Sequence, residues 1–177
     1  DRLVDLLLEN EITPFLTLYH WDLPETLQKE GGWQNRRTAD AFAEYAAGIA
    51  RHFDGRVFHY ITLNEPQCFI ELGHQKGVHA PGLKLDRGGI LACVQNALLA
   101  GGLGARALRT YSTAQIQIGL ASTGRICYPI KDTPQGRKAA YRASFRMEEN
   151  DWLFTHSWLL DAAVLGQFPA DAPAFEK

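Results

Sequence analysis

The spacing of hydrophobic residues along the chain predicts alternating strands and helices. Short apolar runs bounded by turn residues predict three buried strands, at residues 15–20, 57–64 and 115–120. Apolar residues that recur every three or four positions predict helices at residues 3–8, 38–53 and 88–111. A last helical pattern begins at Thr133 and Pro134, an N-cap followed by proline at the first helical position, and continues toward Gly166. Residues 65–86 are predicted to be a long loop with three glycines and Pro81.

The order of these elements favours an α/β fold. Strands that alternate with helices of ten or more residues are typical of parallel βαβ units with right-handed crossovers. Two architectures fit, namely part of a (β/α)₈ barrel or a small doubly wound sheet. No GxGxxG or GxxxxGK[ST] turn follows a predicted strand, which weakens the doubly wound alternative. Because a whole barrel needs roughly 200 to 400 residues, we expect residues 1–177 to form a single fragment of one.

Composition narrows the classes of partner. The chain is 46% hydrophobic with a net charge of -2, which excludes a disordered protein. The 18 basic residues do not exceed the 20 acidic ones, so we expect no nucleic-acid partner. No continuous apolar run reaches the ~18–20 residues that span a membrane, so we expect no membrane partner either.

The cysteines and the ends of the chain give weaker indications. Cys68, Cys93 and Cys127 are odd in number and form no CxxC motif, which argues against a disulfide framework and a zinc site. We therefore expect free thiols in a reducing, cytoplasmic compartment. The chain does not begin with Met and opens inside a helical pattern, so we expect a piece of a longer protein, from which a signal peptide could have been removed.

Polar and aromatic side chains gather where two of the predicted strands end. The first strand leads into His20 and Trp21, and the second leads into Asn64, Glu65 and Pro66. In a barrel, the C-terminal ends of the strands form the catalytic face. A carboxyl group in apolar surroundings holds its proton more firmly, which suits a general acid. Each residue alone is more often structural, but together they offer hydrogen bonds and a flat apolar wall to a hydroxyl-rich ligand.

Three segments carry a more specific pattern: TPFLTLYHWDLPETLQKEGGW from Thr13, FHYITLNEP from Phe58 and GHQKGVHAPG from Gly73. They closely resemble glycoside hydrolase family 1, which contains retaining β-glucosidases, β-galactosidases and 6-phospho-β-glycosidases on a (β/α)₈ barrel. The likeness covers essentially the whole chain. In family order, it implies barrel strands 3 to 5 with their helices.

The resemblance also implies an activity and residue roles. The expected enzyme is a retaining β-glycosidase, first of all a β-glucosidase, that hydrolyses terminal β-linked glucosyl residues by double displacement. Its substrate would be a small-molecule β-glycoside or an oligosaccharide, and no cofactor or metal is implied. Glu65 would be the acid/base, Asn64 would bond the 2-hydroxyl group of the sugar, and His20 would bond the 3-hydroxyl group with Trp21 beside it.

One departure from the family pattern limits what the chain can do alone. The family nucleophile is a second Glu in a Glu-Asn-Gly motif, and this tripeptide does not occur here. A retaining glycosidase needs two carboxyl groups, so we expect the isolated chain to be inactive. Two alternatives stay open: a catalytically inactive sugar-binding or interaction relative of the same fold, and a 6-phospho-β-glycosidase. An incomplete barrel would also expose two sheet edges, through which the chain could self-associate.

Overall fold

The computed structural model describes residues 1–147 and 152–172. Backbone contacts divide the chain into two compact units. The first unit comprises residues 1–64 and 99–121, and the second comprises residues 65–98 and the described residues from 122 onward. The expectation of a single fragment over residues 1–177 is not tested by this division and stays a prediction.

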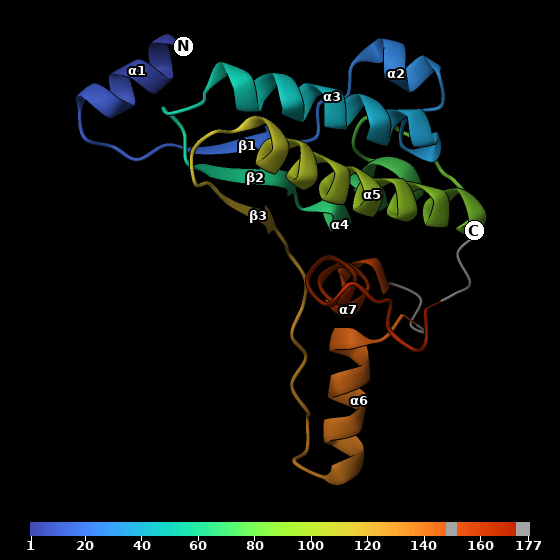
Figure 1. Cartoon of the computed structure of the whole chain (residues 1–177). Coiled ribbons are helices and arrows are strands. Elements are labelled where there is room, and N and C mark those ends of the chain that lie inside the picture. Colours follow the sequence, from blue (N-terminus) through green and yellow to red (C-terminus); the bar gives the residue numbers. More distant parts are fainter. Residues whose placement is uncertain (148–151, 173–177) are drawn as a thin grey trace. The chain divides into compact units, whose positions relative to one another are not determined.

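The first unit is built on a parallel sheet. Its three strands are β1 (Phe15–Tyr19), β2 (His59–Asn64) and β3 (Gln117–Ala121), which lie side by side in the order β1-β2-β3 (Figure 1). Phe15 is paired with His59, and His59 is paired with Gln117. All three predicted strands are therefore confirmed. Because both pairs are parallel, the C-terminal ends of the strands point to the same edge of the sheet.

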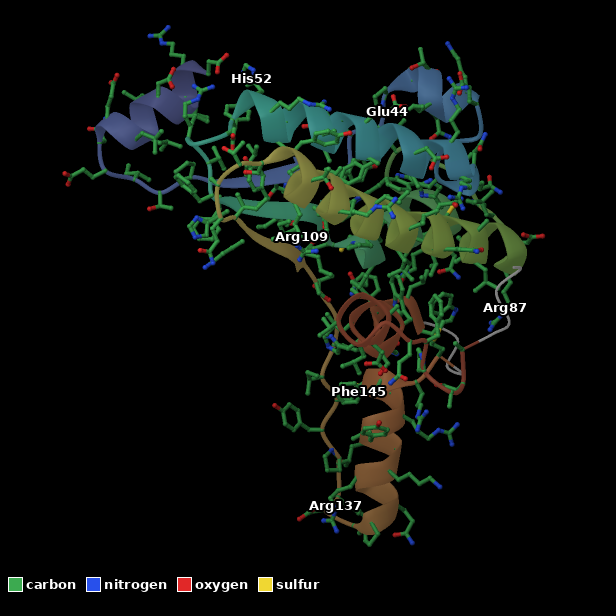
Figure 2. All side chains as sticks on the ribbon, in the orientation of Figure 1. Glu44, His52, Arg87, Arg109, Arg137 and Phe145 are labelled. Carbon is green, nitrogen blue, oxygen red and sulfur yellow. The ribbon has the colours of Figure 1, made fainter. Side chains whose placement is uncertain are left out.

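The first unit also contains helical elements. They are α1 (Arg2–Glu9), α2 (Glu25–Lys29), the 3₁₀ turn η1 (Gly32–Gln34), α3 (Arg36–His52) and the last part of α5 (Arg87–Tyr111). α3 buries Phe42, Ala46 and Ala50, while Glu44 and His52 of the same helix are exposed (Figure 2). α5 passes close to α3 at Gly104, where an added Cβ atom would lie 2.5 Å from the Phe42 ring. A larger residue at this crossing would therefore force the Phe42 ring or the helix to shift.

Asp54, just after α3, holds the loop that leads into β3. Its carboxylate accepts hydrogen bonds from the hydroxyl groups of Thr113 and Ser112, at 2.5 and 2.9 Å, and from the Thr113 backbone N–H at 3.0 Å. These bonds, with the Thr113 hydroxyl as the largest cause, lower the pKa of Asp54. The ionised carboxylate therefore joins two segments that are almost 60 residues apart in the chain.

The second unit contains more helix than the sequence predicts. Its helical elements are α4 (Pro66–Ile70), the π-helical turn η2 (Glu71–Gln75), the first part of α5, α6 (Pro134–Phe145), η3 (Trp152–Phe154), α7 (Ser157–Leu160) and the π-helical turn η4 (Asp161–Leu165). The prediction of a loop from residue 65 is wrong for residues 66–75. Pro66 follows the end of β2 and occupies the first position of α4.

The predicted helix between Thr133 and Gly166 is confirmed only in its first part. The Thr133 hydroxyl accepts a hydrogen bond from the Gly136 N–H at 3.0 Å and begins α6, which runs past Arg137 to Phe145 (Figure 2). The backbone of Arg146 is extended and ends the helix. Apolar residues farther along are instead buried by short turns, which satisfy a three-to-four-residue spacing as well as one long helix does. Four residues of the predicted helix, 148–151, lie outside the described part.

α5 bears on the expectation of no membrane partner. Its 25 residues make it long and apolar enough to cross a membrane by length and composition alone. A search for continuous apolar runs misses it, because Arg, Gln and Asn interrupt the sequence of the helix. Core helices of globular proteins pass the same test, and Gly104 of α5 packs on another helix of its unit. This helix is therefore weak evidence for a membrane segment.

Candidate active site

Three of the four predicted site residues meet in the first unit, where β1 and β2 end. Tyr19 is paired with Leu63, so the residues that follow each strand come out next to one another. The side-chain amide of Asn64 lies 3.3 Å from Nε2 of His20. Trp21 donates a hydrogen bond from its indole N–H to the Asn64 carbonyl at 2.9 Å. The structure thus brings His20, Trp21 and Asn64 together.

The contact between Asn64 and His20 links the position of the imidazole proton to the direction of this hydrogen bond. When the Asn64 amide group donates to Nε2 of His20, that nitrogen carries no proton. The proton of a neutral imidazole then lies on Nδ1. His20 is exposed, and its Nδ1–H can donate to a hydroxyl group of a ligand.

A buried tyrosine supports this group from behind. The Tyr19 hydroxyl donates to the Trp21 carbonyl at 3.1 Å and accepts from the Trp33 indole N–H at 3.0 Å. Burial raises the pKa of Tyr19 to about 12; the bond from Trp33 opposes this shift and the nearby Asp22 adds to it. The hydroxyl group therefore stays neutral and keeps its proton to donate. The role of Tyr19 could not be predicted from the sequence, since nothing in a single strand pattern shows that its hydroxyl meets a tryptophan 14 residues away.

An apolar pocket of about 220 Å³ lies behind the same strand end. Leu18, Leu23, Leu27, Phe42 and Tyr45 are among the residues that line it. Tyr45 is half-buried there, and burial raises its pKa. The lining is apolar, in contrast to the hydrogen-bonding groups of His20 and Asn64, so a hydroxyl-rich ligand fits the strand end better than this pocket.

Glu65 follows Asn64 in the chain and is the first residue of the second unit. Its backbone is left-handed, with φ 45° and ψ 66°, a conformation that costs a non-glycine residue about 1–2 kcal/mol. Its carbonyl accepts from the N–H groups of Cys68 and Phe69, at 2.9 and 3.4 Å, and α4 begins directly afterward at Pro66. The half-buried Glu65 side chain does not cap α4, and its carboxyl group is instead hydrogen-bonded by the Cys68 thiol of the same helix.

Three side chains that follow Glu65, on α4 and η2, are buried, and each is either uncharged or part of an ion pair. Burial raises the pKa of the Cys68 thiol to about 12, and the carboxylates of Glu65 and Glu71 add to the shift. The thiol is therefore protonated and is no nucleophile at neutral pH. Burial lowers the pKa of His74, whose Nδ1 contacts the Phe69 carbonyl. Glu71 is buried and forms an ion pair with Lys76. Within residues 1–147 and 152–172, no group of three or more His, Cys, Asp or Glu side chains is arranged to hold a metal ion.

Comparison with known proteins identifies the family. Residues 1–175 match the model of "Glycosyl hydrolase family 1". The chain belongs to glycosyl hydrolase family 1. Its likeness to relatives covers either about half of it or nearly all of it. It is 57% identical over 84 residues to a 1,4-beta-D-glucan glucohydrolase of Thermotoga neapolitana, a match that covers 48% of this chain and 20% of the relative. It is 39% identical over 171 residues to Beta-glucosidase A of Acetivibrio thermocellus, which covers 97% of this chain and 36% of that protein.

A solved structure extends the comparison to the fold. The family 1 chain is similar to a beta-glucosidase from Thermotoga maritima in complex with deoxynojirimycin, with a TM-score of 0.82 and 35% identity. The match covers 95% of this chain and 36% of the other. The prediction of a partial (β/α)₈ barrel is therefore confirmed. The chain spans about a third of the length of such relatives, and the roles of Glu65, His20, Trp21 and Asn64 stay predictions.

Proposed function

We propose that this family 1 chain supplies the acid/base of a retaining β-glucosidase. Glu65 would first protonate the glycosidic oxygen as the bond to the sugar breaks, and would then deprotonate the water that hydrolyses the glycosyl-enzyme intermediate. One observation carries the proposal above all. Glu65 directly follows Asn64, whose side chain contacts His20, and the Glu65 carboxyl group leaves a strained backbone without capping its helix.

The neighbouring residues of β1 and β2 would bind the sugar. The Asn64 amide offers a donor and an acceptor to the 2-hydroxyl group, and Nδ1–H of His20 offers a donor to the 3-hydroxyl group. The Trp21 indole N–H is bonded to the Asn64 carbonyl, so the ring has a fixed orientation and can present its face to the C–H groups of the sugar. The names of the relatives support glucose rather than a phosphorylated sugar as the substrate.

The nucleophile would come from sequence outside these residues. Because the chain contains no Glu-Asn-Gly motif, we expect the isolated chain to leave an aryl β-glucoside intact. Robust turnover by the isolated chain that Glu65→Gln abolishes would contradict this expectation.

A chimera tests the acid/base role in a complete barrel. The chain would replace the matching segment of the Acetivibrio thermocellus Beta-glucosidase A, along the 171-residue alignment. We expect Glu65→Gln to lower kcat about 10²–10⁴-fold on a β-glucoside with a poor leaving group, which needs protonation. An activated dinitrophenyl β-glucoside, whose leaving group needs no proton, should still form the glycosyl-enzyme at close to the original rate.

The control is Glu44→Gln, which makes the same change at an exposed position of α3 (Figure 2). This variant should match the unsubstituted chimera on both substrates. Equal losses in the rate of glycosyl-enzyme formation from both substrates in Glu65→Gln would refute the acid role. A folded chimera that binds a glucose analogue but hydrolyses neither substrate would favour the sugar-binding alternative.

A further inference from the structure

Gln67, the second residue of α4, is a polar side chain in an otherwise apolar helix. It is completely buried, as are the neighbouring Phe69 and Ile70 to within a few per cent. Its Nε2 donates a hydrogen bond to Oγ of Ser122 at 3.0 Å, and Oγ of Ser122 in turn contacts the carbonyl of Thr123 at 3.3 Å. This chain of hydrogen bonds joins α4 to a segment 55 residues away in the sequence.

Packing alone does not explain an amide at this position. A buried amide is costly unless its hydrogen bonds are made, and an apolar side chain of the same volume would fill the space without that cost. Among the described residues, Oε1 of Gln67 has no hydrogen-bond partner. The bond to Ser122 is therefore the feature that distinguishes glutamine from an apolar residue here.

The location of this bond connects it to Glu65. Gln67 lies between Pro66 and Cys68, in the turn whose N–H groups hold the Glu65 carbonyl. A left-handed backbone at Glu65 persists only where the surrounding structure holds it. Fixing the second residue of α4 fixes the direction of this first turn, and with it the backbone from which the Glu65 carboxyl group projects.

We propose that the Gln67–Ser122 pair positions Glu65 for proton transfer. Gln67 is a positioning residue in this account, since it acts through the first turn of α4 and not on the substrate. The proposal rests on the proposed function of Glu65. It predicts that breaking the pair loosens this turn and impairs protonation of the leaving group.

Hydrogen exchange on the 177-residue chain tests whether the Gln67–Ser122 pair holds the first turn of α4, and it does not require an active enzyme. We expect Gln67→Met and Ser122→Ala to speed the exchange of the Cys68 and Phe69 amide protons about five- to tenfold, the effect of losing one ordinary hydrogen bond. Ser122→Thr, which keeps the hydroxyl group, and Gln34→Met, the same change at an exposed site, should leave these rates unchanged. Unchanged exchange in Gln67→Met and Ser122→Ala would overturn the proposal.

The chimera described above tests whether the pair also supports protonation of the leaving group. We expect Gln67→Met to lower kcat at least tenfold on a β-glucoside with a poor leaving group, with KM nearly unchanged. The rate at which a dinitrophenyl β-glucoside forms the glycosyl-enzyme, which needs no proton, should also stay nearly unchanged. Equal losses in the rate of glycosyl-enzyme formation from both substrates would indicate a merely structural role and overturn the proposal. The unsubstituted chimera could hydrolyse neither substrate while amide exchange in Gln67→Met and Ser122→Ala still becomes faster. In that case the acid/base role of Glu65 fails, and the role of the Gln67–Ser122 pair in holding the first turn of α4 stands.

Discussion

Replacing Tyr19 by Phe tests the support behind the strand ends. The change removes one hydroxyl group and with it two hydrogen bonds, to the Trp21 carbonyl and from the Trp33 indole. Trp33 is only 1% exposed, so water does not replace the hydrogen bond that its N–H group loses. Losing a buried hydrogen bond in this way costs about 1–3 kcal/mol, and we expect Tyr19→Phe to lower the free energy of unfolding by that amount.

Tyr60 provides a matched contrast in the same sheet. Its side chain is as deeply buried as that of Tyr19, at 2% exposed, but its hydroxyl group has no hydrogen-bond partner among the described residues. Replacing Tyr60 by Phe therefore removes a desolvated polar group without breaking a bond. We expect Tyr60→Phe to be neutral or stabilising in this chain, and Tyr45→Phe, at a half-exposed position, to stay within about 0.5 kcal/mol.

Urea denaturation at pH 8 and pH 11, followed by circular dichroism, measures all three variants. The folded state holds the pKa of Tyr19 at about 12, above its ordinary value of 10.0. The neutral hydroxyl therefore contributes its full stability below pH 10, and this contribution is lost as the pH rises toward 12. At pH 11 the contribution of Tyr19 to the free energy of unfolding has fallen by about 1.4 kcal/mol. The difference in the free energy of unfolding between the original chain and Tyr19→Phe should therefore be smaller at pH 11 than at pH 8. A Tyr19→Phe change no larger than that of Tyr60→Phe at pH 8 would refute this reasoning.

Three further substitutions probe other contacts. Gly104→Ala should lower the free energy of unfolding by about 1–3 kcal/mol, because the new Cβ atom meets the Phe42 ring at 2.5 Å; no loss in urea denaturation would show that α5 can shift. Thr133→Ala should lower the stability of α6 by about 1 kcal/mol, because it removes the N-cap of the helix. Amide protons in the first turn of α6 should then exchange faster. Thr133→Ser keeps the hydroxyl group and should leave this exchange unchanged. Asp54→Asn should make the free energy of unfolding depend less on pH between pH 4 and 2. The carboxylate stabilises the fold above its ordinary pKa of 3.8, and this contribution is lost as the pH falls through the lowered folded value; an unchanged profile between pH 4 and 2 would contradict the role of Asp54.

The sheet could be predicted from the sequence because its signals are local. Each strand is a short apolar run, and α3 has an apolar face on which Phe42 and Ala46 are buried. The alternation of the two patterns also gives the parallel pairing, and the structure has all three strands within a few residues of the predicted bounds.

The helix after Glu65 could not be predicted in the same way. Three glycines between residues 73 and 82 favour a loop by composition, but the structure uses two of them, Gly73 and Gly77, for close contacts. An added Cβ atom at Gly73 would lie 2.4 Å from the Ala80 carbonyl oxygen, and Gly77 has a positive φ of 67°. The bonds between Tyr19 and Trp33 and between Gln67 and Ser122 were missed for a related reason. They depend on the tertiary fold, and no spacing within one segment indicates them.

The parallel sheet also suits the chain to an enzyme that is assembled from separately expressed segments. In the described residues, β1 and β3 each pair on one side only, with β2 between them. Both outer strands run in the same direction as β2. A further βα unit can therefore join at either side in the same sense, without reversing the polarity of the sheet. Separately expressed segments of a barrel could recombine with this one, and restored turnover in such a mixture would serve as a direct reporter of reassembly.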